Sequence, residues 1–152
     1  MSDFQVTGGD QFFALSKALK SAGRTGLRKH LNKGLKEGAK PLIPLTRAAA
    51  LAQLPKGGGL AKLVAKAPQR VQVRTGKTPG VRLVVGKTDS GARGANRGEV
   101  RHPFFGDRTQ WFNQAVPAGW FDDTIKANMD KVLPALEQAM HDVIDEIVKG
   151  AK

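Results

Sequence analysis

The sequence contains no cysteine and no tyrosine. Without cysteine, the chain can form no disulfide, no thiol-based active site and no cysteine-ligated zinc site. Without tyrosine, and with its other aromatic residues far along the chain from its most basic segment, it does not match a base-stacking platform for nucleic acid. These two absences argue against thiol enzymes, cysteine-based zinc modules and RNA-recognition sheets.

Long apolar runs are also missing. No stretch approaches the roughly 18 apolar residues that are needed to span a bilayer. The N-terminal segment MSDFQVTGGD has no basic stretch followed by an apolar one, so we expect no secretory signal. We therefore expect no membrane contact.

Catalytic motifs are equally scarce. The glycines at 57–59 are not followed by Lys-Ser or Lys-Thr, and those at 91–98 do not match a dinucleotide fingerprint. The serines lack the context of a nucleophile elbow, and no pair of carboxylates is placed for acid–base work. We therefore expect no enzymatic activity and no cofactor.

The three histidines, His30, His102 and His141, do not occur in pairs at metal-binding spacing. An acidic cluster beside His141, at 142, 145 and 146, could hold a divalent ion. A solvated helix face is the more common role of such a cluster. We expect no bound metal.

What the sequence does have is a strong positive charge of +12 and a pI near 10.4. The charge is uneven, since residues 1–101 carry +15 and residues 102–152 carry −3. A basic body favours a polyanionic partner. Nucleic acid and an acidic protein surface fit equally well, and charge does not decide between them.

Periodicity predicts an α+β fold in a single domain, residues 1–152. Its small antiparallel sheet contains a β hairpin and is flanked by N-terminal helices and a long C-terminal amphipathic helix. The expected elements are a strand at 4–6, helices from Gln11 (capped by Asp10), over 25–40 and over 46–54, a hairpin of 70–74 and 81–85, a flexible loop at about 87–110, and a helix to about 148.

The second expected helix has an apolar face and a basic face. Leu27, Leu31 and Leu35 recur every four residues and should face the core, while Pro41 and Pro44 should break or kink the helix. Its lysine and arginine side chains form a candidate surface for phosphate contacts, although a solvated face or a subunit contact is the more common role. These residues are Arg24, Arg28, Lys29, Lys33, Lys36 and Lys40.

The last helix should begin at Asp122 or Asp123, whose carboxylates suit the positive end of the helix dipole. A kink is expected at Pro134. An apolar stripe at steps of three and four residues should face the core. Its members are Ile125, Met129, Val132, Leu136, Met140, Val143 and Ile147.

The loop and the aromatic segment after it supply candidate interface residues. Tryptophan, phenylalanine and arginine are enriched at protein interfaces, although the aromatic cluster could equally be core. The candidates are Arg93, Arg97, Arg101, His102, Phe104, Phe105, Trp111, Phe112, Trp120 and Phe121.

The order of these elements resembles the tail-completion or neck family of long-tailed phages. Residues 100–121 resemble the branch found in phages of actinobacteria, and they are the most specific part of a likeness that covers most of the chain. The motifs are Val100-Arg-His-Pro-Phe-Phe-Gly-Asp-Arg108, Trp111-Phe-Asn-Gln114 and Val116-Pro-Ala-Gly-Trp-Phe121. Many relatives have an aromatic-and-Glu segment before Gly-Thr where this chain has residues 101–108, so interface residues do not carry over.

The resemblance implies a structural virion protein without enzymatic activity, made in the host cytoplasm. It implies a ring of copies, usually six, at the head-proximal end of the tail. The ring's neighbours would be the tail terminator and the head-side connector or stopper, with DNA passing through the channel. From the residues alone, a sequence-nonspecific DNA-binding protein is the alternative, and an enzyme is a remote third.

Overall fold

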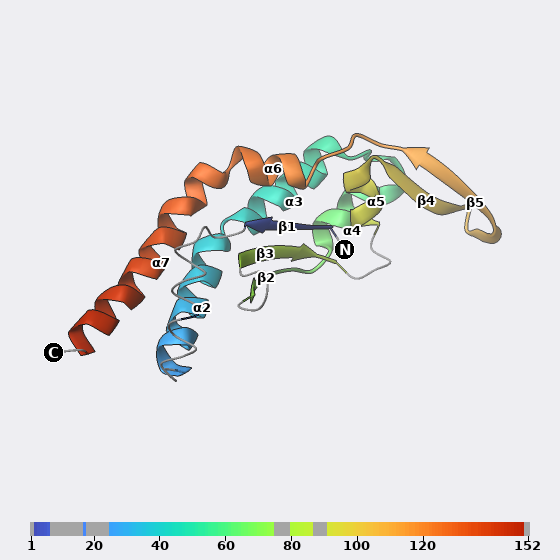
Figure 1. Ribbon diagram of the computed structural model, residues 1–152. Coiled ribbons are helices and arrows are strands. Elements are labelled where there is room, and N and C mark those ends of the chain that lie inside the picture. The colour runs from blue at the N-terminus through green and yellow to red at the C-terminus, as the bar shows by residue number, and fades with distance from the viewer. Residues whose placement is uncertain (1, 7–16, 18–24, 75–79, 87–90, 151–152) are drawn as a thin grey trace. The chain divides into compact units, whose positions relative to one another are not determined.

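The computed structural model describes residues 2–6, 17, 25–74, 80–86 and 91–150 (Figure 1). The helix expected after Asp10, and Arg24, lie outside these residues. The chain divides into two compact units. Unit 1 comprises residues 1–4, 43–70 and 84–127, and unit 2 comprises residues 5–42, 71–83 and 128–152. The expected single domain stays a prediction.

Two helices pack against each other in unit 2. These are α2 (Thr25–Ala39) and α7 (Met129–Gly150). Gly34 lies where they approach closely, because a Cβ at this position would be 2.8 Å from the Cβ of Ala139. Leu27, Leu31 and Leu35 of α2 face the core, as does the apolar stripe of the C-terminal helix, and both were expected to do so. The buried cluster consists of Leu31, Leu35, Ala39, Val81, Leu136, Ala139 and Val143.

A three-stranded sheet has the order β1-β3-β2. Its strands are β1 (Ser2–Val6), β2 (Gln69–Arg74) and β3 (Gly80–Val85). The expected first strand and the two strands of the hairpin are therefore confirmed, while the turn at 75–79 lies outside the described residues. β3 is central and mostly buried, which explains its nearly continuous apolar sequence.

The Ala-rich helix begins earlier in the chain than expected. The Ala-rich helix α3 runs over Leu42–Gln53 and begins four residues before the expected Thr46. Pro44 is its third residue, where a backbone N–H would have no partner within the helix, so proline is tolerated there. A 3₁₀ turn, η1 (Gly57–Gly59), leads into α4 (Leu60–Lys66).

The expectation of a loop at about 87–110 was wrong for the part that the structure describes. This part forms a helix, α5 (Ala92–Arg97), and an antiparallel pair of strands, β4 (Glu99–Phe104) and β5 (Asp107–Ala115). The sequence did not predict these strands, because both faces of the β4–β5 pair are largely exposed. Without a buried face, the sequence has no apolar–polar alternation of the kind that marks a strand.

The C-terminal helix is in fact two helices. α6 (Asp122–Ala127) precedes α7, and the break falls at Asn128, whereas Pro134 lies inside α7. The mixed α+β class with a long C-terminal helix is confirmed. Among the described residues, no helix is both long and apolar enough to cross a membrane.

Candidate functional site

Strands β4 and β5 with their turn, residues 99–115, form a two-stranded ribbon that we call the aromatic arm. Figure 1 shows it extending beyond α4 and α5 of the same unit. His102 pairs with Phe112 and Pro103 with Trp111. Because neighbouring side chains on a strand point to opposite faces, this register gives the arm two distinct faces.

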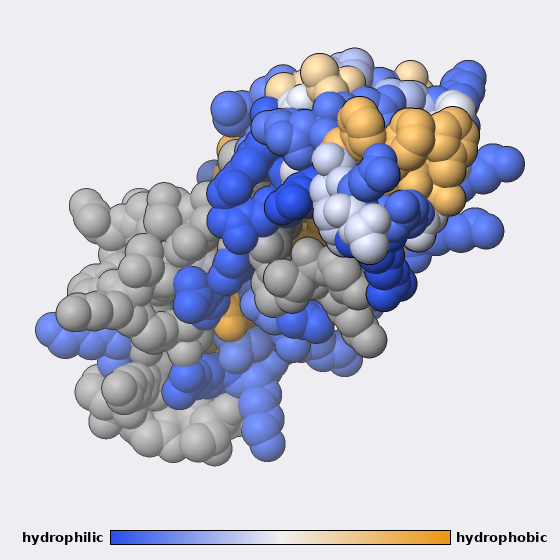
Figure 2. Space-filling view, turned by 90° about the vertical axis from the view of Figure 1, so that its right-hand side faces the viewer, coloured by the Kyte–Doolittle hydropathy of each residue, from blue (hydrophilic) through white to orange (hydrophobic). Residues whose placement is uncertain are grey.

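One face carries a cluster of phenylalanines. The ring of Phe104 lies 4.8 Å from that of Phe112 and 4.6 Å from that of Phe105. Phe104 and Phe112 are about half exposed, and Phe105 is 95% exposed. Figure 2 views the molecule from the side that has β4 and β5 in Figure 1, and it shows an orange hydrophobic patch among blue hydrophilic surface. The rings stack on each other without reaching the core.

The other face joins a tryptophan to an arginine. The guanidinium of Arg101 lies 5.3 Å from the centre of the Trp111 ring, within the range of a cation–π contact. The indole Nε1 of Trp111 donates a hydrogen bond of 2.8 Å to the carbonyl oxygen of Arg108. Trp111 remains 47% exposed, so this face too presents an aromatic surface to solvent.

The turn at the arm's end is tight and charged. Phe104 and Asp107 are paired, and both residues between them, Phe105 and Gly106, have positive φ, at 45° and 87°. The carboxylate of Asp107 accepts hydrogen bonds from Oγ1 and the backbone N–H of Thr109, at 2.7 and 2.9 Å. These bonds, the hydroxyl's first, lower the pKa of Asp107 below its ordinary value. The arm therefore ends in two phenyl rings beside a carboxylate.

The start of α6 is held by a residue that sequence reasoning missed. The amide oxygen of Asn96 accepts hydrogen bonds from the backbone N–H groups of Phe121 and Asp122, and its Nδ2 donates to Asp122 Oδ2. The backbone oxygen of Asn96 accepts from the N–H of Gly119. Asn96 thus caps α6 from α5. An asparagine in a Gly/Arg-rich stretch gives no sequence signal of a contact 25 residues away.

The structure divides the predicted interface residues into three groups. Trp120 and Phe121 are completely buried in unit 1 and pack edge to face on each other, so their assignment to an interface is corrected to core. Arg93 and Arg97 both lie on the short helix α5, and both are exposed. The remaining candidates lie on the arm. They are Arg101, His102, Phe104, Phe105, Trp111 and Phe112.

The predicted basic surface lies on α2. Lys29, Lys33 and Lys36 on α2, and Lys40 directly after it, are exposed. They follow steps of four, three and four residues, so they lie along one side. Lys40 pairs with Glu37 at 2.6 Å, and Arg28 is half-buried. Both shallow hollows on α2 are lined by Lys29, Lys33 and Glu37. The lysines form a continuous positive stripe.

The polar groups near the C-terminus are engaged locally. His30 Nδ1 lies 2.8 Å from Glu146 Oε1, and Asp142 accepts a hydrogen bond from Gln138. Within the described ranges, no group of three or more His, Asp or Glu side chains is arranged to hold a metal ion. Among the described residues, the aromatic arm and the lysine stripe carry exposed side chains whose chemistry suggests binding.

Comparison with known proteins gives no further assignment. No protein-family model matches the chain, and neither a search of curated proteins nor one of solved structures found a significant match.

Proposed function

We propose that the protein is a structural component of a phage virion, a tail-completion protein that joins the tail to the head-side connector as a ring subunit. The observation that carries this proposal is the aromatic arm. Its exposed aromatic residues are Phe104, Phe105, Trp111 and Phe112.

Physical reasons support an assembly role for the arm. A two-stranded ribbon without a buried face is marginally stable in water, and clustered exposed aromatic side chains mark interaction sites on soluble proteins. Covering the arm with a partner would bury the rings and stabilise the strands together. The arm is therefore best understood as one half of a protein–protein contact.

The resemblance to the tail-completion family adds the identity of the assembly. The segment that carries it, residues 100–121, comprises most of the arm and the buried Trp120 and Phe121. On this proposal the copies form a ring, usually of six. One side of the ring faces the tail terminator, and the other faces the connector or stopper.

Two experiments test the proposal. Cryo-electron microscopy of purified virions should show density for this chain at the neck, and its absence from the particle would refute the function. The double variant Trp111→Ala/Phe112→Ala should fold as the parent does but give particles in which heads and tails are not joined.

The matched control for this variant is Ile144→Ala/Val148→Ala, which removes two apolar side chains of similar exposure, 40% and 54%, from α7. It should leave joining intact. Fully infectious particles from the arm variant, or equal defects in both, would contradict the role of the arm.

A second candidate function is sequence-nonspecific DNA binding, and the lysine stripe on α2 favours it. Four exposed lysines on one side of a helix can contact phosphates, and removing one phosphate contact reduces the dependence of log K on log salt by about 0.9. Lys33→Glu/Lys36→Glu should therefore weaken duplex binding and lower the salt slope. A parent protein that shifts no duplex DNA at low salt would remove this candidate.

A further inference from the structure

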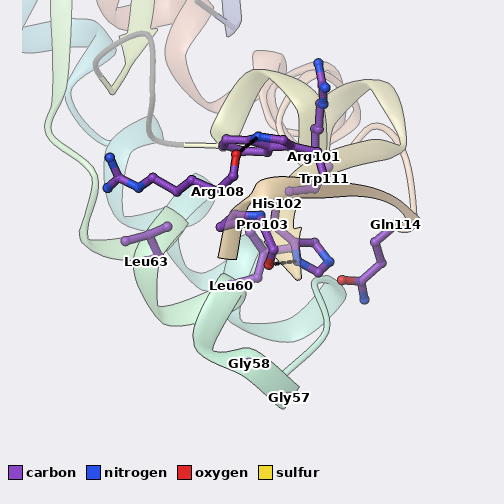
Figure 3. Close-up of a pocket in the computed structure, with 12 residues that line it drawn as sticks. Gly57, Gly58, Leu60, Leu63, Arg101, His102, Pro103, Arg108, Trp111 and Gln114 are labelled. Atoms are coloured by element: carbon purple, nitrogen blue, oxygen red, sulfur yellow. Dashed lines mark hydrogen bonds between the residues drawn. The ribbon is translucent and has the colours of Figure 1, made fainter. Parts of the chain in front are cut away.

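A pocket of about 580 Å³ lies beside the arm in unit 1 (Figure 3). Leu60 and Leu63 of α4 form one wall, and Trp111 with Pro103 of the arm forms another. Arg101 and Arg108 add positive charge to the lining. The pocket thus combines apolar walls with two guanidinium groups.

The pocket opens to solvent at its rim. Leu63, which lines the pocket, is 58% exposed. A Cβ built on Gly57 or Gly58, which also line the pocket, would meet nothing within 4 Å. A side chain from outside can therefore enter without displacing this part of the chain.

The turn of the arm matches this pocket chemically. It presents Phe105, which is 95% exposed, beside the carboxylate of Asp107, which like an ordinary aspartate is charged at neutral pH. A phenyl ring fits apolar walls, and a carboxylate fits a guanidinium group, which Arg101 and Arg108 supply at two places around the pocket. The volume is within the range of protein pockets that bind small molecules, so it accommodates a phenylalanine side chain.

The conformation of Phe105 indicates that its side chain is selected for something other than the turn. Two-residue hairpin turns with positive φ at both positions favour Asn-Gly or Asp-Gly. A bulky residue at φ 45° is strained. Strain of this kind is characteristic of functional positions, and the ring of Phe105, in T-shaped contact with Phe104, is 95% exposed.

We propose that the turn of the arm of one copy of this chain inserts Phe105 into the pocket of the next copy. In this contact, Asp107 of the first copy approaches Arg101 and Arg108 of the second. The proposal deepens the proposed function, on which it rests, by naming the contact that links one ring subunit to its neighbour.

Charge favours a second copy as the occupant. Copies of a chain with a net charge of +12 repel each other. The proposed contact offsets this repulsion locally, because the carboxylate of Asp107 on one copy meets the positive side chains of Arg101 and Arg108 that line the pocket of the other. DNA is a poor occupant, since a phosphate backbone supplies no phenyl ring for the apolar walls that Leu60, Leu63 and Trp111 form.

The proposed contact joins two different patches of the same chain. Such a heterologous contact repeats from copy to copy and generates a closed ring, or a filament where the rotation does not close. Reciprocal exchange of two arms would instead stop at a dimer. The geometry of the product therefore distinguishes the proposal from the nearest alternative.

Because the chain has no native cysteine, any disulfide formed in a trapping experiment joins only the introduced cysteines. In the double variant Phe104→Cys/Leu63→Cys, which keeps the Phe105 ring and Asp107, oxidation should give a ladder of covalent oligomers on a non-reducing gel. The matched control is Phe104→Cys/Val148→Cys, because Val148 and Leu63 have nearly equal exposure, 54% and 58%. The control should give no ladder beyond the dimers that Phe104→Cys forms alone.

Three gel results would overturn the proposal. They are a ladder of equal yield in the control, dimers alone in the Leu63 variant, and a monomer whose two cysteines are joined within one chain. The proposal would also be overturned if neither concentrated purified protein nor assembled particles gave a ladder.

The variant Phe105→Asn separates docking from folding. Asparagine suits the turn better than phenylalanine, so the variant should fold at least as stably as the parent while its oligomers disappear. Oligomers that persist at parental yield in Phe105→Asn would contradict insertion of the ring.

A photo-crosslinker, p-benzoylphenylalanine, placed at position 105 identifies the occupant directly. Crosslinks from assembled particles should map to residues 57–63 of another copy. Crosslinks to a different virion protein would overturn this contact but leave the neck function standing. Conversely, a disulfide ladder from a chain that is absent from virions would support the contact and refute the neck function.

Discussion

Replacing Asn96 by alanine should destabilise unit 1 more than any other single change of a polar residue on α5. The side chain makes three hydrogen bonds with the start of α6, at 2.8, 3.0 and 3.2 Å, to Phe121 and Asp122. Asn96→Ala removes all three. The N–H of Phe121, whose side chain is fully buried, then lacks its acceptor.

The expected cost follows from the kinds of hydrogen bond that the variant removes. A neutral intramolecular hydrogen bond contributes about 1 kcal/mol, and one to a charged group about 1.5–3 kcal/mol. Removing a helix N-cap alone costs about 0.5–2 kcal/mol. Because the two N–H bonds are the cap, these figures overlap, and we expect Asn96→Ala to lower the free energy of unfolding by about 3 kcal/mol.

Urea unfolding followed by tryptophan fluorescence measures this change. In a Trp111→Phe background the only fluorophore is Trp120, which is fully buried in unit 1. The matched control is Asn113→Ala, since Asn113 is an exposed asparagine on β5. It should change the midpoint little, with an effect within about 0.5 kcal/mol.

A cost below about 1 kcal/mol for Asn96→Ala, the contribution of a single ordinary hydrogen bond, would refute the capping role of Asn96. A second variant tests the role of the donor. Asn96→Asp keeps an acceptor for the two N–H groups but sets a carboxylate against Asp122, 2.8 Å from the present donor. It should also destabilise unit 1 at neutral pH, and part of the stability should return when acid protonates the pair.

Further predictions concern packing and the turn. Gly34→Ala should destabilise by about 1–3 kcal/mol, because its methyl would lie 2.8 Å from a methyl of α7, whereas Gly26→Ala, with open space around it, should stabilise α2 in thermal melts. Trp120→Ala should cost about 3–5 kcal/mol in urea unfolding, since the ring is fully buried. Asp107 has a lowered pKa, so its contribution to the turn is present above the pKa of the unfolded chain and disappears as pH falls through the folded pKa. In Thr109→Val, NMR titration should show that pKa rise.

Helical periodicity predicted α2 and α7 well. Their apolar residues recur at three and four positions, and they pack together in unit 2 as that pattern requires. Gly34 illustrates the limit of such reasoning. By propensity it weakens α2, yet a side chain at this position would collide with the facing helix.

The aromatic segment shows the same limit more sharply. Sequence alone could place Trp111 and Trp120 in one cluster, because the chemistry of the two side chains is identical. Only the tertiary structure separates them, since Trp120 is buried against Phe121 while Trp111 lies on an exposed ribbon. Burial depends on which segments meet in space, and that information is absent from a local pattern.

Composition and short-range periodicity were enough to establish the fold class, the long helices, the strands β2 and β3 and the uneven charge, because each of these is a property of a local stretch of chain. Three other features required the folded chain. The segment expected as a loop forms strands of the arm, and Asn96 lies at the start of α6. Leu63 and Trp111 line the same pocket. Each of these depends on contacts between residues distant in the chain, which no local pattern encodes.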